Sequence, residues 1–283
     1  KEFPLVANSG RYRDQWHTMT RTGTAARLSA HRPEPLLELN IRDAKRYNLI
    51  DGGLARIKSP QGTALMRVSI SDAQAPGDVF VPMHWNDVFS SAGGIGRLLP
   101  ANVDPYSGQP ESKYIPVSVE PFEPLWQGLL FSNTPVDLSN QPYWVAATGP
   151  GCMIYEIAGD QPCLFKSMLP VAANSDSDAG PEQIIEYNDG KKGVHRYARM
   201  RKDRITGALF VGPDRPALGR GWISGLLGTD AISGPERIAL LAGRMPDARA
   251  INDRLICSCF SVGLAAITRA IHEQNAVSTT DIG

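Results

Sequence analysis

Short apolar runs, each ended by a turn signal, fill roughly the first 120 residues of this chain and constrain its fold most. The runs lie at residues 54–57, 65–70, 79–82 and 114–119. Glycine, proline, aspartate and serine separate them, which is the pattern of β-strands joined by turns. One short helix is predicted at residues 41–47, with Asn40 as its N-cap. Many short strands and a single helix favour a closed barrel, because closure leaves no unpaired strand edge.

The rest of the chain mixes predicted strands with helices. Residues 122–149 are rich in proline, tryptophan and asparagine, and we interpret them as a packed linker. Further strands are predicted at residues 144–147, 152–157, 164–169, 184–187, 194–199 and 205–211, with a hairpin turn at 188–190. Ser233 and Glu236 fit a capping box that opens a helix, and Gly243 can end it. The predicted fold class is therefore mainly β with α.

Composition excludes several kinds of protein. The 283 residues contain 29 basic and 29 acidic side chains, so the zero net charge favours neither nucleic acid nor a membrane surface as partner. No apolar run reaches the roughly 18 residues that a membrane-spanning helix needs. Four cysteines at uneven spacing do not form the pattern of a disulfide framework. We therefore expect a cytoplasmic protein, since that compartment keeps thiols reduced.

One segment suits a phosphate ligand on chemical grounds. It reads Gln15-Trp16-His17-Thr18-Met19-Thr20-Arg21-Thr22-Gly23. Threonine hydroxyls and loop N–H groups donate hydrogen bonds, and an arginine binds two oxygens at once, so a phosphate or pyrophosphate fits this composition. The same chemistry leaves open a plainer alternative, an exposed polar loop without a ligand.

The order of these residues resembles a known signature. Residues 16–23 are similar to the motif that opens the C-terminal domain of molybdopterin oxidoreductases, the group of nitrate reductases and formate dehydrogenases. Motifs at residues 33–35, 39–44, 49–52, 76–85 and 104–113 follow in the family's order, so the resemblance covers roughly residues 9–122. It implies a double-psi β-barrel that binds the phosphates of molybdopterin guanine dinucleotide. The implied cofactor-binding residues are Gln15, Trp16, His17, Thr18, Met19, Thr20, Arg21, Thr22, Gly23 and Lys113.

The resemblance also implies an activity for a whole enzyme. Residues 84–87 and 107–111 are similar to the assimilatory branch, and Gly96 stands where many periplasmic relatives have a cofactor-binding asparagine. That branch reduces nitrate to nitrite by two-electron oxygen-atom transfer at molybdenum. The resemblance suggests that Met83, His84 and Trp85 line the substrate funnel. The chain alone is expected to be inactive, because N-terminal catalytic domains of the same polypeptide complete such an enzyme.

Cys257-Ser258-Cys259 is a candidate iron–sulfur motif. Two thiolates at a helix N-terminus favour an anionic cluster, and apolar residues at helical spacing predict that a helix begins near Cys259. Buried structural cysteines are the alternative. Residues 256–263 are similar to the opening of bacterioferritin-associated-ferredoxin-like [2Fe-2S] domains, which need a second cysteine pair that does not follow before Gly283. We therefore expect half of a ligand set, no cluster in this chain, and a longer natural protein.

A basic stretch suggests a docking partner. Residues 191–220 contain nine basic side chains and two acidic ones, Asp203 and Asp214. This stretch is either a solvated hairpin face or a docking patch for an acidic electron donor, because charge steers such encounters. The donor would be a ferredoxin, a flavodoxin or an NADH-dependent reductase subunit.

We expect three domains, and two alternative functions remain open. Residues 1–122 would form the cofactor-binding β-barrel, residues 123–250 an α+β domain associated with electron transfer, and residues 251–283 a short helical tail that starts the [2Fe-2S] domain. The same region of a formate dehydrogenase is one competitor, which the assimilatory-type motifs and the cluster-like tail disfavour. A non-enzymatic β-barrel interaction module is the other, and it would bind no pterin cofactor.

Overall fold

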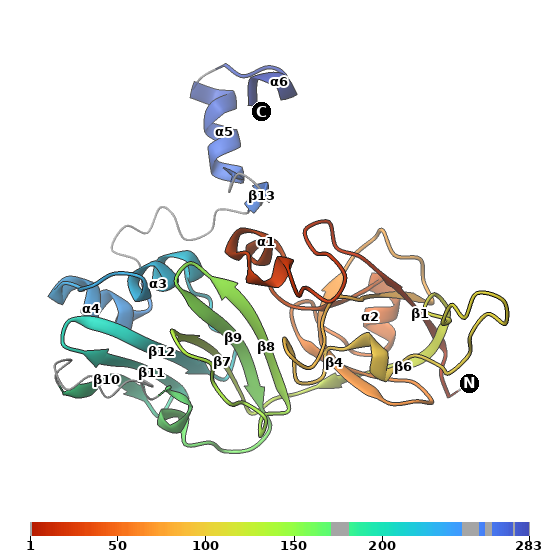
Figure 1. The fold of residues 1–283 in the computed structure, drawn as a ribbon, viewed down its shortest axis with the longest axis horizontal. Coiled ribbons are helices and arrows are strands. Elements are labelled where there is room, and N and C mark those ends of the chain that lie inside the picture. The colour runs from red at the N-terminus through yellow and green to blue at the C-terminus, as the bar shows by residue number, and fades with distance from the viewer. Residues whose placement is uncertain (1, 171–180, 245–254, 258–261, 274, 283) are drawn as a thin grey trace.

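A computed structural model describes residues 2–170, 181–244, 255–257, 262–273 and 275–282. A closed barrel, coloured red to yellow, lies beside an open sheet, coloured green to cyan (Figure 1). Only residues 123–125 connect the last barrel strand to the first strand of the sheet. The two parts are therefore held close together by the chain itself.

Six strands close the barrel in the order β1-β5-β2-β4-β3-β6. They are β1 Leu5–Gly10, β2 Leu36–Leu39, β3 Leu54–Lys58, β4 Thr63–Ile70, β5 Asp78–Pro82 and β6 Ile115–Phe122. The pairs β1–β5 and β2–β4 are parallel, and the other neighbours are antiparallel. The predicted closure is confirmed, as are the four predicted strands β3 to β6.

Alternating side chains fill the barrel. Along β6 the residues Ile115, Val117 and Val119 are buried, whereas Pro116 and Glu120 are exposed. This period of two is what a strand with one buried face produces, and each fully buried aliphatic side chain contributes about 1.5–3 kcal/mol. Helix α2, Ile41–Arg46, begins where predicted, because the Asn40 side chain accepts a hydrogen bond from the Arg42 N–H. Short helices η1 Thr22–Thr24, α1 Ala26–His31 and η2 Ile95–Arg97 lie in the connections.

The second sheet is antiparallel and runs in the order β10-β11-β12-β7-β9-β8. Its strands are β7 Trp126–Ser132, β8 Tyr143–Gly149, β9 Cys152–Gly159, β10 Glu182–Asp189, β11 Val194–Arg201 and β12 Arg204–Gly212. Helices α3, Arg220–Leu227, and α4, Gly234–Ala242, pack against it. The capping box of Ser233 and Glu236 is present at the start of α4, and Gly243 ends the helix in the left-handed conformation.

Two predictions for this region are wrong. The supposed linker at residues 122–149 contains β7, an inner strand of the sheet, as well as β8. The prolines flank β7 without interrupting it, and nearly all of its side chains are buried. The predicted strand at 164–169 is instead the 3₁₀ helix η3, Phe165–Met168, because the Ser167 hydroxyl donates to the Leu164 carbonyl and closes a tight turn.

The last described elements are β13 Leu255–Cys257, β14 Val262–Gly263, α5 Leu264–Glu273 and α6 Thr279–Ile282. Because Val262 and Gly263 pair with β13, the helix begins at Leu264 and not near Cys259, as the apolar spacing suggested. Cys259 itself lies outside the described residues. Within the described ranges, no helix combines the length and the apolar character that crossing a membrane requires.

Candidate functional site

The 15–23 segment follows β1 and ends within η1, and it has one buried and one exposed side. Gln15, Met19 and Gly23 are buried. Thr22 is half-buried, and the exposed residues are Trp16, His17, Thr18, Thr20 and Arg21. The side chains with phosphate-binding chemistry therefore face solvent, while three others fix the loop to the protein.

His84 holds the start of this segment. Its side chain is 0% exposed and lies between two backbone groups. Nε2 accepts a hydrogen bond from the Tyr12 N–H at 2.9 Å, and Nδ1 donates to the His17 carbonyl at 2.5 Å. One nitrogen must accept and the other donate, so the ring is neutral. Burial, which lowers the pKa of His84 below its ordinary value, agrees with this assignment.

Side chains also hold the rest of the segment. The Thr22 hydroxyl donates to Gln15 Oε1 at 2.7 Å and accepts from the Trp16 N–H at 3.2 Å. The Gly23 carbonyl accepts from the Thr148 hydroxyl at 2.6 Å. Because Thr148 belongs to β8, the second sheet helps to shape a segment that follows the first barrel strand. Sequence reasoning missed His84 in this role, and it missed Thr148 altogether.

Strain and unused donors characterise the exposed side. His17 has a φ of 47° and Met19 a φ of 62°, a left-handed backbone that costs a residue with a side chain about 1–3 kcal/mol. Within the described part of the chain, the Thr18 and Thr20 hydroxyls and the Arg21 guanidinium make no hydrogen bond or ion pair. Strained backbone concentrates at functional sites, and these donors are free to bind a ligand.

Positive charge gathers around the segment. Five arginines and one acidic residue lie between residues 11 and 32. The acidic residue, Asp14, is buried and already contacts Arg13 and His31. Lys113 adds a further positive charge near the end of β1, because it precedes β6 and β6 pairs with β1. Its Nζ donates to the Ser9 carbonyl. The residues predicted to bind the cofactor are thus brought together around β1, and their binding role stays a prediction.

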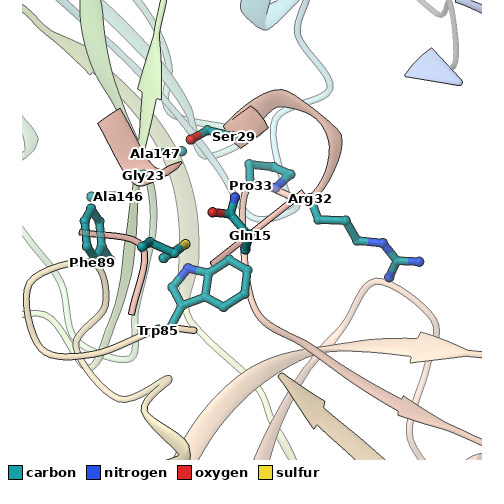
Figure 2. A pocket seen from close by; sticks show the side chains of 10 residues that line it. Gln15, Gly23, Ser29, Arg32, Pro33, Trp85, Phe89, Ala146 and Ala147 are labelled. Atoms are coloured by element: carbon teal, nitrogen blue, oxygen red, sulfur yellow. The ribbon is translucent and has the colours of Figure 1, made fainter. Parts of the chain in front are cut away.

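A small cavity lies beneath the segment. Gln15, Gly23, Trp85, Phe89 and Ala146 are among its lining residues (Figure 2). Its volume of about 10 Å³ is at most enough for one water molecule. The Trp85 indole N–H is buried without a hydrogen-bond partner in the described structure. A ligand of any size must therefore bind on the exposed side of the segment.

The three residues predicted to line a substrate funnel lie at the base of this site. His84 and Trp85 are buried, and half-buried Met83 packs against the barrel core. In the described residues their contacts are with the protein interior, so a place in a funnel stays a prediction.

A buried network joins the barrel to the second sheet, and sequence reasoning missed it. Its members are Glu34, Arg67, Tyr143, Glu156, Arg215 and Arg220, which we call the Glu34–Arg67 network. Arg67 donates to Glu34 at 2.8 Å, and the Tyr143 hydroxyl donates to the same carboxylate at 2.9 Å. Arg215 donates to both glutamates, and Arg220 donates to Glu156. Burial raises the pKa of Glu34, but Arg67 and Arg215 outweigh it, so the net pKa lies below its ordinary value.

Of the nine basic residues in the stretch 191–220, four arginines form ion pairs within the protein. Arg199 and Arg201 bind Glu182, while Arg215 and Arg220 belong to the Glu34–Arg67 network. Carboxylates of the same chain therefore pair these four charges. Docking of an acidic donor on this stretch stays a prediction.

Of the candidate metal ligands, Cys257 lies in β13 and is half-buried. Cys259 falls outside the described residues. Among the residues whose positions are described, no group of three or more histidine, cysteine or acidic side chains could hold a metal ion.

Comparison with known proteins gives the site a context. Residues 5–116 match the family model of the Molydopterin dinucleotide binding domain. Over 269 residues the chain is 40% identical to a nitrate reductase from Klebsiella oxytoca, covering 95% of this chain and 30% of that protein. A nitrate reductase from Shewanella frigidimarina is also 40% identical, over 95% of this chain and 29% of its own length. Formate dehydrogenase H from Escherichia coli is 31% identical over 42% of this chain and 16% of its own length.

The chain thus spans about 30% of the length of the two nitrate reductases that it matches. The matched domain includes the barrel strands β1 to β5 and the whole 15–23 segment.

Proposed function

We propose that residues 5–116 hold a molybdopterin dinucleotide and that the chain is the cofactor-binding part of a molybdenum-dependent nitrate reductase. The observation that carries the proposal is the exposed side of the 15–23 segment, where the donors of Thr18, Thr20 and Arg21 have no partner among the described residues. The match of residues 5–116 to the Molydopterin dinucleotide binding domain supports it.

The residues present fit an anionic dinucleotide. Thr18 and Thr20 would donate their hydroxyls to phosphate oxygens, and Arg21 would bind two oxygens as a fork. Lys113 would add a positive charge beside β1. His84 would position the loop through Tyr12 and His17 without touching the cofactor. When bound, the cofactor supplies the metal chemistry of oxygen-atom transfer, and this chain supplies binding and orientation.

Nitrate is favoured over formate as the substrate of the whole enzyme. The similarity to two nitrate reductases runs through the barrel and the second sheet, over 95% of this chain. The similarity to formate dehydrogenase H covers 42% of the chain. The larger shared length supports a nitrate reductase, in which the rest of the polypeptide provides the catalytic domains.

Further details extend this proposal. The motifs at residues 84–87 and 107–111 support the assimilatory branch. The proposal also includes the guanine form of the dinucleotide, from the family resemblance, and a cytoplasmic location, from four cysteines without a disulfide pattern. Cys257 and Cys259 would provide two of the four thiolates of a [2Fe-2S] cluster, and an acidic donor would deliver electrons. Extending the chain by some tens of native residues and supplying iron and sulfide should produce the EPR signal of that cluster. A folded, colourless protein would rule out the cluster.

Replacing Arg21 in the whole enzyme tests the cofactor site. We expect Arg21→Gln to weaken cofactor binding about tenfold to hundredfold, because a charge-assisted contact contributes about 1.5–3 kcal/mol. The measurement is molybdenum and pterin content after gel filtration. Arg42→Gln is the matched control, since Arg42 is exposed on α2, outside the segment. Equal cofactor content in both variants and the parent enzyme would contradict the proposal.

A further inference from the structure

We propose that the second sheet carries its own binding site for a small organic phosphate, separate from the 15–23 segment. The site is a pocket of about 560 Å³ between β11, the end of β12 and the end of α4, which we call the β11–α4 pocket. Its lining residues include Lys192, Val194, Arg196, Leu218 and Arg244. Pockets that bind small molecules usually measure about 300–1,000 Å³, so this volume suits a ligand of nucleotide size.

Arg196 is the central charged residue of the pocket. Its Nη1 donates to the Leu241 carbonyl at 2.8 Å, and its guanidinium lies over the Tyr187 ring at 5.5 Å. Both contacts fix the orientation of the side chain and neither neutralises its charge. No described carboxylate forms an ion pair with Arg196. A pre-oriented, half-buried guanidinium is the kind of group that binds phosphate.

Two further cations face the same pocket. Arg244 follows α4, and its charge is close enough to add to the effect of burial in lowering the pKa of Arg196. Lys192 also lines the pocket, and its ammonium group lies 3.7 Å from the Asp189 carboxylate. Asp214 is the acidic residue among the lining side chains, and Asp189 pairs with Lys192, so Arg196 and Arg244 are the lining cations without an ion pair among the described residues. An anion bound between the two guanidiniums would relieve their repulsion.

The remaining walls are apolar. Val194, Pro213, Pro216 and Leu218 line them. Gly243 closes one side with a φ of 63°, and a Cβ there would lie 3.1 Å from Leu218 and 3.2 Å from Arg196. The end of α4 therefore packs against the apolar wall and the central arginine together. Such a pocket, lined by both cations and apolar carbon, suits a phosphate attached to an organic body rather than a free inorganic ion.

Titration calorimetry on the 283-residue chain at low ionic strength tests the site, with AMP and inorganic phosphate as probes. We expect AMP to bind more tightly than inorganic phosphate, because only AMP offers an organic body to the walls. Arg196→Gln and Arg244→Gln should each weaken AMP binding about tenfold or more, since each removes one charge-assisted contact. Arg244 is exposed, so its substitution keeps the test valid if loss of Arg196 disturbs the fold.

Two controls separate this site from other sources of binding. Lys191→Gln removes the same charge from an exposed residue that does not line the pocket, and it should change AMP affinity less than twofold. Arg21→Gln identifies any AMP that binds at the 15–23 segment. AMP binding that is lost in Arg21→Gln but kept in Arg196→Gln and Arg244→Gln belongs to the 15–23 segment and would overturn the proposal. Equal losses in Lys191→Gln and Arg244→Gln, or no AMP binding at all, would also overturn it. Equal affinity for AMP and inorganic phosphate would contradict the proposal that the apolar walls bind the organic part of the ligand.

Discussion

Replacing Glu34 with glutamine should destabilise this protein more than any exposed charge change. Glu34 is 3% exposed and accepts hydrogen bonds from Arg67, Arg215 and Tyr143. The Glu34–Arg67 network contains three arginines and two glutamates, so its net charge is +1. Glutamine keeps the volume of the side chain and raises that net charge to +2. Arg67, with a 2% exposed side chain, then loses its main carboxylate partner.

The magnitude follows from this burial. Removing one partner of a buried ion pair costs about 3–5 kcal/mol, because the remaining charge stays out of water without compensation. For a chain of this size, roughly 2–3 °C of melting temperature corresponds to each kcal/mol, so the midpoint should fall by about 6–15 °C. Glu120→Gln is the matched control. Glu120 also contacts two cations, Arg56 and Lys58, but its side chain is 48% exposed, so the change should stay below about 1 kcal/mol.

The assay is urea unfolding followed by tryptophan fluorescence, repeated across pH. The pKa of Glu34 in the folded protein lies below its ordinary value of 4.5. Its contribution is therefore complete above about pH 4.5 and is lost as the pH falls through the folded pKa. The difference in free energy of unfolding between the parent protein and Glu34→Gln should decrease over that acidic range. If Glu34→Gln lowers the free energy of unfolding at pH 7 by no more than Glu120→Gln does, the reasoning is refuted.

Two further substitutions test how the 15–23 segment is held. His84→Phe leaves the Tyr12 N–H and the His17 carbonyl unpaired, so it should cost about 1–3 kcal/mol and speed hydrogen exchange at the Tyr12 amide. The lowered pKa of His84 makes the parent protein lose stability as the pH falls below 6.5, and this dependence should vanish in the variant. Gly23→Ala would place a Cβ 2.9 Å from Phe89 and should cost about 1–3 kcal/mol, whereas Gly190→Ala, with open space around it, should change unfolding little.

The barrel was predictable in part because its strands carry their own pattern. β3 to β6 alternate or run continuously apolar between turn residues, and that pattern identified them. The sequence of β1 is Leu-Val-Ala-Asn-Ser-Gly, and its polar residues interrupt the apolar pattern by which a strand is recognised. Its backbone groups are satisfied by β5 and β6, which lie far along the chain. Local pattern therefore could not reveal it.

The candidate site shows the same limit. The 15–23 segment was identified from its own residues, but the groups that hold it come from elsewhere. The register of β1 and β5 pairs Gly10 with Pro82, which brings His84 next to Tyr12 just beyond the strand ends. Glu34 and Arg67 look like ordinary surface charges in the sequence, because the partners that bury them belong to separate elements. Contacts between residues that the topology brings together could not be predicted from the sequence, whereas features formed by neighbouring residues could.

Closure of the barrel by its first strand has a consequence for synthesis on the ribosome. Leu5 is paired with Val117, so β1 emerges long before β6, the second of its two partner strands, exists. At about 5–20 residues per second, the intervening chain takes on the order of 5–20 seconds to be made. The 15–23 segment waits even longer for Thr148, to which Gly23 is anchored. A nascent chain therefore exposes this segment unshaped until β8 has been translated, and a ligand that needs its final form has to arrive after that time.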